Sequence, residues 1–395
     1  MGLALLVLSA CGKPAPTAET KDIEFAPVKI GLVVTTGGKG GDLAGPSLGA
    51  AAVAASHVKK DSGKKITIIE ADYQGDLSLV EQLVSDLESK ADVIIAATDD
   101  PAVLPALSKV RLPVIHPFIT SEGVSGETRF RLAPSDALQA KRLAEFLVKR
   151  RGYELVGIIR ENTEYGTSGA ARFAEAVQTA GGTVVANAPF DTGGDIHTPV
   201  SIAADRGAQA VAVWTDDAAE AARVAIDVHR SSASYQLALP FNAAGPTFGK
   251  NAVAQVVPTA FREGILSIGP WAGPWLNAPR IARFYKDYEK RQNDVAPVRA
   301  AQVYDAVLMS SAARAKGEVA DGLRSLKDFQ GASVPVTFDQ RNEGMDESDL
   351  WAWGFTKSKD GAGAEFFPAV DTGGGFFTLI PAGLEIPARF RYQLR

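Results

Sequence analysis

The chain has 395 residues, more than a single hydrophobic core usually supports, so we expect at least two lobes or domains. Apolar residues make up 46% and charged residues 22%, which is typical of a folded globular protein and excludes an intrinsically disordered one. A net charge of −5 without a basic run argues against nucleic-acid binding, and no apolar stretch reaches the roughly 18–20 residues that span a bilayer.

The N-terminus has the pattern of an export leader. An unbroken apolar run from Gly2 to Leu8 leads into Leu8-Ser9-Ala10-Cys11, which resembles the end of a bacterial lipoprotein signal. Cys11 is the only cysteine, so no intramolecular disulfide is possible, and a Pro/Ala/Thr-rich spacer suited to a tether follows it. No Lys or Arg precedes the apolar run, so we expect the natural leader to begin further upstream.

We therefore predict lipid attachment at Cys11 and a location in the periplasm or cell envelope, anchored to the membrane. The alternative is that Cys11 is a stray thiol after a short leader.

Strand and helix patterns alternate twice along the chain. In the first run, strands are predicted over residues 28–34, 66–71, 93–97 and 113–115, with helices over 47–60, 80–87 and 101–109. The second run opens with a helix from Pro134-Ser135-Asp136 to Gly152, followed by strands over 155–159, 183–188, 210–214 and 236–239. Repeated βα units predict an α/β fold with two doubly wound parallel-sheet lobes.

In such sheets, ligands bind outside the carboxyl ends of the strands. The loops at these ends are rich in Gly, Thr, Asp and Asn, and they form no recognisable catalytic set. They cover residues 35–45, 98–100, 117–121, 161–168, 215–217 and 241–245.

Several segments, in order, resemble the branched-chain amino-acid-binding protein family, the type I periplasmic binding proteins of ABC transporters. The matching segments are residues 29–49, the Pro-Val-Ile-x-Pro element at 113–117, Phe-Arg-Leu-Ala-Pro-Ser-Asp at 130–136, Tyr-Gly at 165–166, Tyr-Asp-Ala-Val at 304–307, and 326–331 before 336–339. The resemblance covers residues 28–355, and residues 371–395 fall outside it.

The resemblance implies that the two lobes are discontinuous in sequence and joined by a three-strand hinge, with crossings near Pro134, Gly269 and Val334. It implies four parts: a signal and tether over residues 1–27, an N-terminal lobe over 28–134 plus 270–334, a C-terminal lobe over 135–269 plus 335–370, and an extension over 371–395 of unknown role.

The resemblance also implies a function without turnover. A protein of this family captures a small molecule by hinge closure and delivers it to an ABC transporter permease. We accordingly expect a monomer without cofactor or metal, which binds no nucleic acid. A ligand sensor on the same fold, signalling to a partner, is the alternative of a different class.

The family's ligand pocket can be carried over residue by residue. Thr120 matches a hydroxyl that holds a ligand carboxylate, and Tyr165 matches an aromatic residue from the second lobe. Asn242 stands where amino-acid binders place an acid for the ammonium group. The other candidates are Asp99 or Asp100 at a usual Ser, Phe118 at a small residue, Asp216 and the neighbouring Thr215 near another pocket position, and Arg299 on the hinge side.

Several of these residues also have a structural interpretation. Asp100 before Pro101 fits a helix N-cap, and Asp217 with Glu220 has capping-box spacing. Tyr165 is also consistent with packing under its own loop. The pair Trp271 and Trp275 fits either a hydrophobic ligand wall or a packed surface loop, and we leave both open.

The acids suggest which ligands are disfavoured. Asp99 and Asp100 would lie near the ligand carboxylate, and two like charges about 4 Å apart repel by roughly 4 kcal/mol at an effective dielectric near 20. We therefore predict that leucine, isoleucine and valine bind poorly and that the ligand is neutral or cationic, with any apolar part facing Phe118 and Tyr165.

Two enzyme alternatives are weaker. Asp191-Thr192-Gly193 and Asp371-Thr372-Gly373 resemble the aspartic-protease triplet, but that fold is all-β. Gly45-Pro46-Ser47-Leu48-Gly49 matches the nucleophile-elbow pattern, although a long Gly-rich loop precedes it, so Ser47 is interpreted as a helix cap. The four histidines, His57, His116, His197 and His229, show no metal-like spacing and are interpreted as surface or packing residues.

Overall fold

The computed structural model describes residues 23–379 apart from 125, 232, 234, 245–264, 271–278, 295, 347–349, 358–363 and 374–375, and its side chains are described as far as Leu350. Cys11 and the pair Trp271 and Trp275 lie outside the described residues. Within the described part of the chain, no helix is long and apolar enough to cross a membrane.

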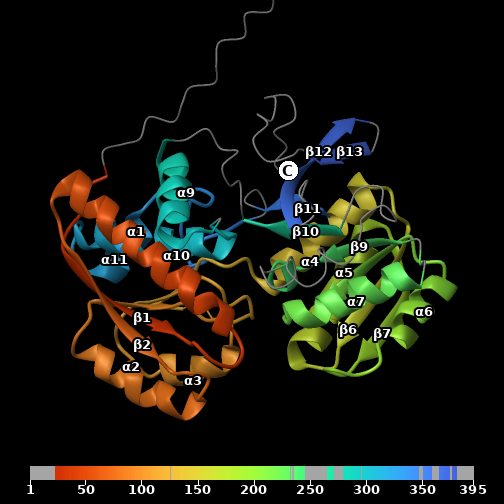
Figure 1. Ribbon diagram of the computed structural model, residues 1–395, viewed down its shortest axis with the longest axis horizontal. Helices are drawn as coiled ribbons and strands as arrows, with labels where there is room; N and C mark the ends of the chain where they lie inside the picture. Colours follow the sequence, from red (N-terminus) through yellow and green to blue (C-terminus); the bar gives the residue numbers. More distant parts are fainter. Residues whose placement is uncertain are drawn as a thin grey trace, which may run out of the picture.

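The described chain forms two α/β lobes that lie side by side (Figure 1). The first lobe contains a five-stranded sheet in the order β2-β1-β3-β4-β5, with every pair parallel. Its strands are β1 (Val28–Val34), β2 (Ile66–Asp72), β3 (Val93–Ala96), β4 (Val114–His116) and β5 (Arg129–Arg131).

Helices cover both faces of the first sheet (Figure 1). On one face lie α1 (Ala44–Ser62), α9 (Pro279–Gln292), α10 (Val298–Arg314) and α11 (Val319–Ser325). On the other face lie α2 (Val80–Glu88) and α3 (Leu104–Leu107). Short 3₁₀ turns, η1 (Gly41–Leu43), η2 (Leu77–Leu79) and η3 (Pro101–Val103), precede α1, α2 and α3.

Side chains of β1 alternate between the two faces, as the pleat of a strand requires. Ile30, Leu32 and Val34 pack with α1 and α10, whereas Val33 packs with α2 and α3. Because both faces are buried, the strand is apolar almost throughout, as is usual in parallel sheets.

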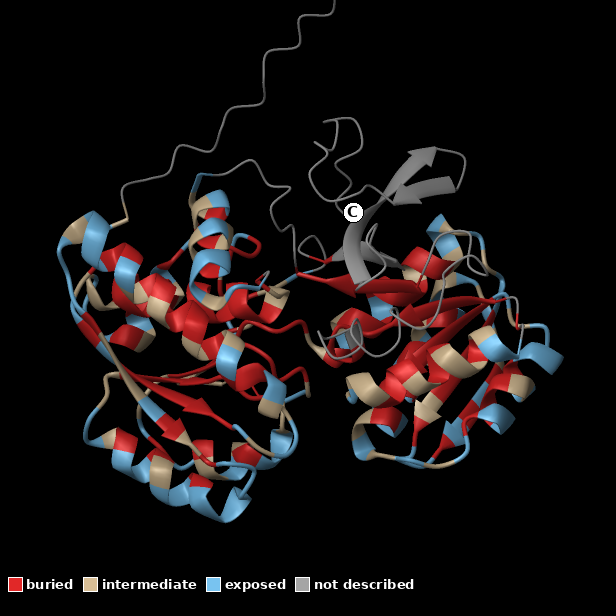
Figure 2. Ribbon diagram, viewed as in Figure 1, coloured by how far each residue is buried: buried red, intermediate tan, exposed pale blue. Residues whose placement is uncertain are grey.

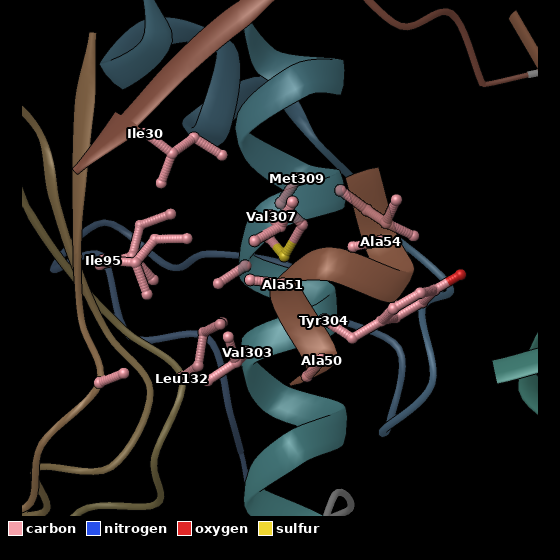
Figure 3. Close-up of a cluster of buried hydrophobic side chains, with 14 of the residues drawn as sticks. Ile30, Ala50, Ala51, Ala54, Ile95, Leu132, Val303, Tyr304, Val307 and Met309 are labelled. Atoms are coloured by element: carbon pink, nitrogen blue, oxygen red, sulfur yellow. The ribbon is translucent and has the colours of Figure 1, made fainter. Parts of the chain in front are cut away.

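Helix α10 is the centre of the first core. Every residue from Arg299 to Ala313 is buried, which explains why a helix so rich in Ala and Ser lies inside the lobe (Figure 2). Figure 3 shows Val303, Val307 and Met309 of α10 packed between the sheet and the small residues of α1, such as Ala51. Small side chains on α1 allow the two helices to approach closely.

The second lobe is built on an eight-stranded sheet in the order β13-β12-β11-β10-β9-β8-β6-β7. Strands β7, β6, β8, β9 and β10 are parallel, and β11, β12 and β13 extend the sheet with antiparallel pairs. The strands are β6 (Leu155–Glu161), β7 (Thr183–Phe190), β8 (Ala210–Trp214), β9 (Gln236–Leu239), β10 (Ile265–Gly269), β11 (Trp351–Lys357), β12 (Ala364–Gly373) and β13 (Phe376–Leu379).

The helices of the second lobe also divide between two faces. Val211 and Val213 of β8 pack with α6 (His197–Asp205) and α7 (Ala218–Arg230). Ala212 and Trp214 pack on the opposite face with α4 (Asp136–Glu145) and α5 (Glu164–Ala180). A π-helical turn, η4 (Phe146–Arg150), continues α4, and a 3₁₀ turn, η5 (Asn242–Ala244), follows β9.

The predicted fold, two doubly wound parallel-sheet lobes, is confirmed. Strands β8 and β9 have the predicted bounds, and Ser135 caps α4 by accepting a hydrogen bond from Leu138 N. The short strand β5 was not predicted. Residues 371–373 and 376–379, for which no structure was predicted, lie in the antiparallel strands β12 and β13.

The chain passes between the two hydrophobic cores in three places, between residues 132 and 140, 268 and 284, and 338 and 350. Val336 and Phe338 pack in the first core, so the third passage lies beyond the crossing predicted near Val334. The third connecting segment is bonded to the end of β5, just before the first connecting segment: Arg131 pairs with Glu343 at 2.7 Å, and its backbone N–H donates to Asn342 O.

Candidate ligand-binding site

Eight of the nine candidate residues lie just after the carboxyl ends of parallel strands. Asp99 and Asp100 follow β3, Phe118 and Thr120 follow β4, Tyr165 follows β6, Thr215 and Asp216 follow β8, and Asn242 follows β9. Arg299 lies instead in the first turn of α10. The sheet geometry therefore gathers residues from distant parts of the sequence at the strand ends where α/β proteins bind ligands.

Arg299 and Asp99 form a buried ion pair. The guanidinium Nη1 donates to Asp99 Oδ2 at 2.7 Å, and the two side chains are only 5% and 9% exposed. The other carboxylate oxygen, Asp99 Oδ1, has no partner among the described residues. Asp99 is thus neutralised by a cation of its own lobe.

The Arg299 guanidinium also reaches the second lobe. Its Nη2 donates to the backbone oxygen of Asn242 at 3.1 Å. The guanidinium carbon lies 5.6 Å from the ring centre of Phe118 and 5.7 Å from that of Phe241, within the range of cation–π attraction. Arg299 therefore contacts aromatic residues that follow strands of both sheets.

A direct hydrogen bond joins the candidate residues of the two lobes. Asn242 Nδ2 donates to Thr120 Oγ1 at 2.9 Å, and both residues are buried. The loop that carries Thr120 is held by Arg131, whose guanidinium donates to the backbone oxygens of Thr120 and Ser121 at 2.9 and 2.6 Å. Arg131 is a positioning residue that the sequence analysis did not identify.

Three polar atoms around Thr120 have no partner among the described residues: Asp136 Oδ1, Tyr165 Oη and Asn242 Oδ1. Burial raises the pKa of Asp136 to about 6, and it raises the pKa of Tyr165 well above the ordinary value of a tyrosine. The Thr120 hydroxyl lies close enough to both groups to oppose the rise in their pKa through a hydrogen bond, but its single proton can serve only one of them at a time. An unmet buried polar group costs about 1–3 kcal/mol, so this cluster favours a ligand that forms hydrogen bonds with it.

An aromatic platform lies beside this cluster. The Tyr165 ring stacks on Trp214 with ring centres 6.4 Å apart and an interplanar angle of 24°. A Cβ on Gly169 of α5 would lie only 1.4 Å from Trp214 Nε1, so the glycine is required for the helix to pass close to the indole. Tyr165 is thereby packed on its own lobe while its hydroxyl faces Thr120 and Asp136.

Asp216 is bonded across the lobes by a residue that the sequence analysis did not single out. Lys39, in the glycine-rich loop after β1, donates from Nζ to Asp216 Oδ2 at 2.5 Å. Lys39, Asp136 and Phe241 all lie in segments marked by sequence as strand-end loops or a helix start. The sequence could not predict which side chain of each segment faces the site.

Two candidates have structural roles instead. Asp100 accepts a hydrogen bond from Ala102 N and caps η3, as the alternative interpretation proposed. The Thr215 hydroxyl donates to Glu161 Oε2 at 2.6 Å within its own lobe, and Glu161 also accepts from Thr192. The structure therefore does not bring Asp100 and Thr215 together with the Thr120 cluster.

Some local interpretations are corrected. Asp217 caps α7 as predicted, but Glu220 bonds to Gly193 N and Arg223 and does not complete a capping box. Ser47 is buried in the first turns of α1, and its N-cap is Leu43, so Ser47 is not a cap. The segment 45–49 is helical, which contradicts the sharp strand-to-helix turn of a nucleophile elbow.

The aspartic-protease alternative is inconsistent with the α/β fold. Asp191 accepts a hydrogen bond from Asn162 Nδ2 at 2.6 Å, and Asp371 lies in β12, where side chains are not described. Among the described residues, no group of three or more His, Cys, Asp or Glu side chains could hold a metal ion.

Asp136 should make stability depend on pH. Burial raises the pKa of the Asp136 carboxyl from the ordinary aspartate value of 3.8 to about 6, so the folded chain binds this proton more tightly than the unfolded chain does. The stability that Asp136 contributes is therefore present below about pH 4 and is lost as the pH rises through 6. Between pH 4 and 8, the wild type should lose roughly 2.4 kcal/mol of unfolding free energy relative to Asp136→Asn.

Urea unfolding of both proteins at several pH values measures this difference. The exposed Asp205→Asn serves as the control and should follow the wild type. Parallel pH profiles for wild type and Asp136→Asn would show that the Asp136 carboxyl keeps an ordinary pKa in the fold.

A protein-family model matches most of the chain. A family model described as periplasmic binding protein matches residues 27–358. No protein of curated function matches the chain.

Solved structures share the fold at low sequence identity. The branched-chain amino acid transporter substrate-binding protein LivJ from Streptococcus pneumoniae, in complex with isoleucine, is 19% identical, with 87% of this chain and 99% of that chain covered and a TM-score of 0.70. A type 1 periplasmic binding protein from Bordetella pertussis is 20% identical, with coverage of 87% and 100% and a TM-score of 0.71.

A third similar structure is an ABC transporter substrate-binding protein from Desulfitobacterium hafniense in complex with Leu. It is 18% identical, with coverage of 86% and 99% and a TM-score of 0.71. At these identities, the likeness establishes the fold and leaves the ligand open.

Proposed function

The chain belongs to the periplasmic binding protein family, and on this basis we propose that it captures a small polar solute between its two lobes and delivers it to an ABC transporter permease. The observation that carries the proposal is the cluster of unpartnered polar atoms around Thr120. Asp136 Oδ1, Tyr165 Oη and Asn242 Oδ1 come from three separate segments, and Thr120 lies on the opposite lobe.

The hydrogen-bonding groups of the cluster limit the chemical classes of solute that can bind to it. Asn242 Oδ1 is an acceptor, and ionised Asp136 offers an acceptor as well, so the solute is expected to present N–H or O–H donors to them. Tyr165 is partly exposed and can provide aromatic surface for an apolar part of the solute, whereas Phe118 is fully buried beside Arg299. Binding would then exchange unmet polar groups for hydrogen bonds, each contributing about 0.5–1.5 kcal/mol, or about 1.5–3 kcal/mol where a charge takes part.

Contacts within the protein alter the effect that Asp99 and Asp100 are expected to have on the charge of the ligand. The charge of Asp99 is balanced by Arg299, and the Asp100 carboxylate is engaged by the backbone of η3, which it caps, and by the nearby Lys39 charge. The repulsion that we expected against leucine, isoleucine and valine loses its physical basis. The proposed solute class is therefore neutral, zwitterionic or amine-bearing.

Hinge closure is the proposed mechanism of capture. The chain connects the two cores three times, and contacts such as Asn242–Thr120 exist only when the lobes are close together. A solute that bonds to both lobes binds the closed arrangement more tightly, so it shifts the equilibrium toward closure. We propose no chemical turnover.

Native mass spectrometry of protein purified without refolding tests the capture of a solute. We expect one small molecule per chain, released by acid and rebinding to the emptied protein. Absence of any bound or rebinding small molecule across extracts of the native host would contradict the proposal.

The sensor alternative requires a separate test. If the protein feeds a permease, deleting its gene should abolish uptake of the identified solute by the cells. Normal uptake together with a lost transcriptional or motility response to the solute would favour the sensor.

We also propose that the mature protein is monomeric and anchored to the cell envelope through lipid on Cys11. Replacing Cys11 with Ala should remove the acyl group and release the protein from the membrane fraction, because this chain has no other cysteine. Intact-mass measurement and fractionation check the outcome, and Thr17→Ser, in the spacer beyond the signal, is a conservative control. A wild-type protein without added lipid mass would disprove the anchor.

A further inference from the structure

The loop that carries Lys39 is fixed close to the site. Gly38 and Gly40 have φ angles of 67° and 79°, which favour glycine over other residues. A Cβ on Gly40 would lie 2.7 Å from Asp99 Oδ1, so the loop packs against the acid that pairs with Arg299. The position of Lys39 therefore follows from the backbone of the loop and does not depend on a long flexible connection.

The ammonium group of Lys39 reaches over to the second lobe. Its bond to Asp216 Oδ2 joins residues 177 positions apart, one after β1 of the first sheet and one after β8 of the second. Asp99 and Asp100 also favour its positive charge. Lys39 is thus surrounded by acids from both lobes.

Asp216 is the more buried partner of the pair. Its side chain is 10% exposed, against 39% for Lys39. Burial lowers the pKa of Lys39, but the charge of Asp216 and the hydrogen bond raise it more. Burial raises the pKa of Asp216, and Lys39 only partly opposes this rise. Both pKa values are therefore raised: the pair stabilises the charged form of Lys39, but it does not fully offset the cost of burying the Asp216 carboxylate, which is the less exposed partner.

We propose that Lys39 is a specificity-determining residue that ties the two lobes together in the absence of solute and keeps Asp216 from binding a cationic group of the solute. This inference rests on the proposed function, because it concerns what the inter-lobe site admits. With Arg299 on Asp99 and Lys39 on Asp216, each acid is paired with a cation of the protein, although Asp99 Oδ1 has no hydrogen-bond partner among the described residues. The proposed solute position is at the unpartnered atoms around Thr120.

The lobe-tying role is tested on solute-free protein by small-angle scattering. Lys39→Met and Asp216→Asn should each increase the radius of gyration relative to wild type, and the double variant should increase it no further than either single variant, because both changes remove the same bond. Lys64→Met, at an exposed lysine of the same lobe, is the control and should change nothing. A wild-type radius of gyration for both single variants would overturn this role.

The selectivity role is tested by calorimetric titration with L-arginine as a cationic probe and L-leucine as a probe without side-chain charge. Lys39→Met should bind L-arginine at least tenfold more tightly than wild type, with no such gain for L-leucine. If Lys39→Met gains no more affinity for L-arginine than for L-leucine, Lys39 does not keep Asp216 from binding a cationic group of the solute.

These outcomes are separate from the test of the proposed function. The scattering experiment needs no solute, so its failure leaves solute capture intact. Failure of the native mass spectrometry would disprove solute capture whatever the scattering shows.

Discussion

Replacing Arg299 with alanine should lower the free energy of unfolding by roughly 3–5 kcal/mol, the usual cost of leaving one member of a buried ion pair without its partner. Arg299 is 5% exposed and pairs with Asp99 at 2.7 Å, and its removal also frees the backbone oxygen of Asn242. Chemical denaturation of the solute-free protein measures the loss. Replacing Asp99 and Arg299 together should cost less than the sum of the two single changes, because the double variant leaves no unpaired charge.

Arg283→Ala is the matched control. Arg283 bonds both oxygens of Asp61 in the first lobe, but these side chains are 36% and 48% exposed, so the loss should stay below about 1 kcal/mol. A loss for Arg299→Ala no larger than for Arg283→Ala would show that the Asp99 pair is solvated and contributes little.

Replacing Asn242 with leucine should weaken solute binding by roughly 10- to 100-fold. The substitution keeps the size of the side chain but removes the unpartnered Oδ1 and the donor to Thr120. Loss of one buried hydrogen bond with exposure of its partner costs about 1–3 kcal/mol, and each 1.4 kcal/mol is a factor of ten in affinity. Titration of the co-purified solute into the emptied variant measures the change.

Asn187→Leu, at an exposed position of β7 in the same lobe, is the control and should bind the solute as the wild type does. Thermal unfolding of both variants establishes that they are folded at the titration temperature. Unchanged affinity in Asn242→Leu would place the solute away from the Thr120 cluster.

The arrangement of the site could be predicted from sequence only as far as the strand ends. Apolar runs such as those of β1 and β8 determine which segments form buried parallel strands, and their carboxyl ends must then meet at one edge of each sheet. For this reason Thr120 and Asn242 could be placed at the site, and the structure does join them by a hydrogen bond.

Charge pairing could not be predicted. Arg299 and Asp99 are 200 residues apart, and Lys39 and Asp216 are 177 apart, so no local pattern marks them as partners. Without knowledge of its partner, Asp99 was treated as a free negative charge. The prediction that leucine, isoleucine and valine bind poorly followed from this charge. Asp100 differs because its cap is local, and Asp-Pro before a helical turn was sufficient to predict it.

The directions in which side chains point could not be predicted either. Asp136 was predicted as part of a helix start, and Ser135 does cap α4, but the sequence pattern cannot show that the Asp136 carboxyl faces Thr120. Ser47 illustrates the opposite error, because a serine after Gly-Pro resembles a cap and here lies inside α1. In both cases tertiary packing decides the environment of the side chain.

A crystal structure of the protein purified without refolding would test the central claim most directly. We predict electron density for one small molecule in contact with Thr120, Asp136, Tyr165 and Asn242, with Arg299 still bonded to Asp99. Density for a bound molecule elsewhere, for example in the cavity of about 210 Å³ lined by Phe25, His57 and Arg283, with the Thr120 cluster filled by protein side chains alone, would contradict it.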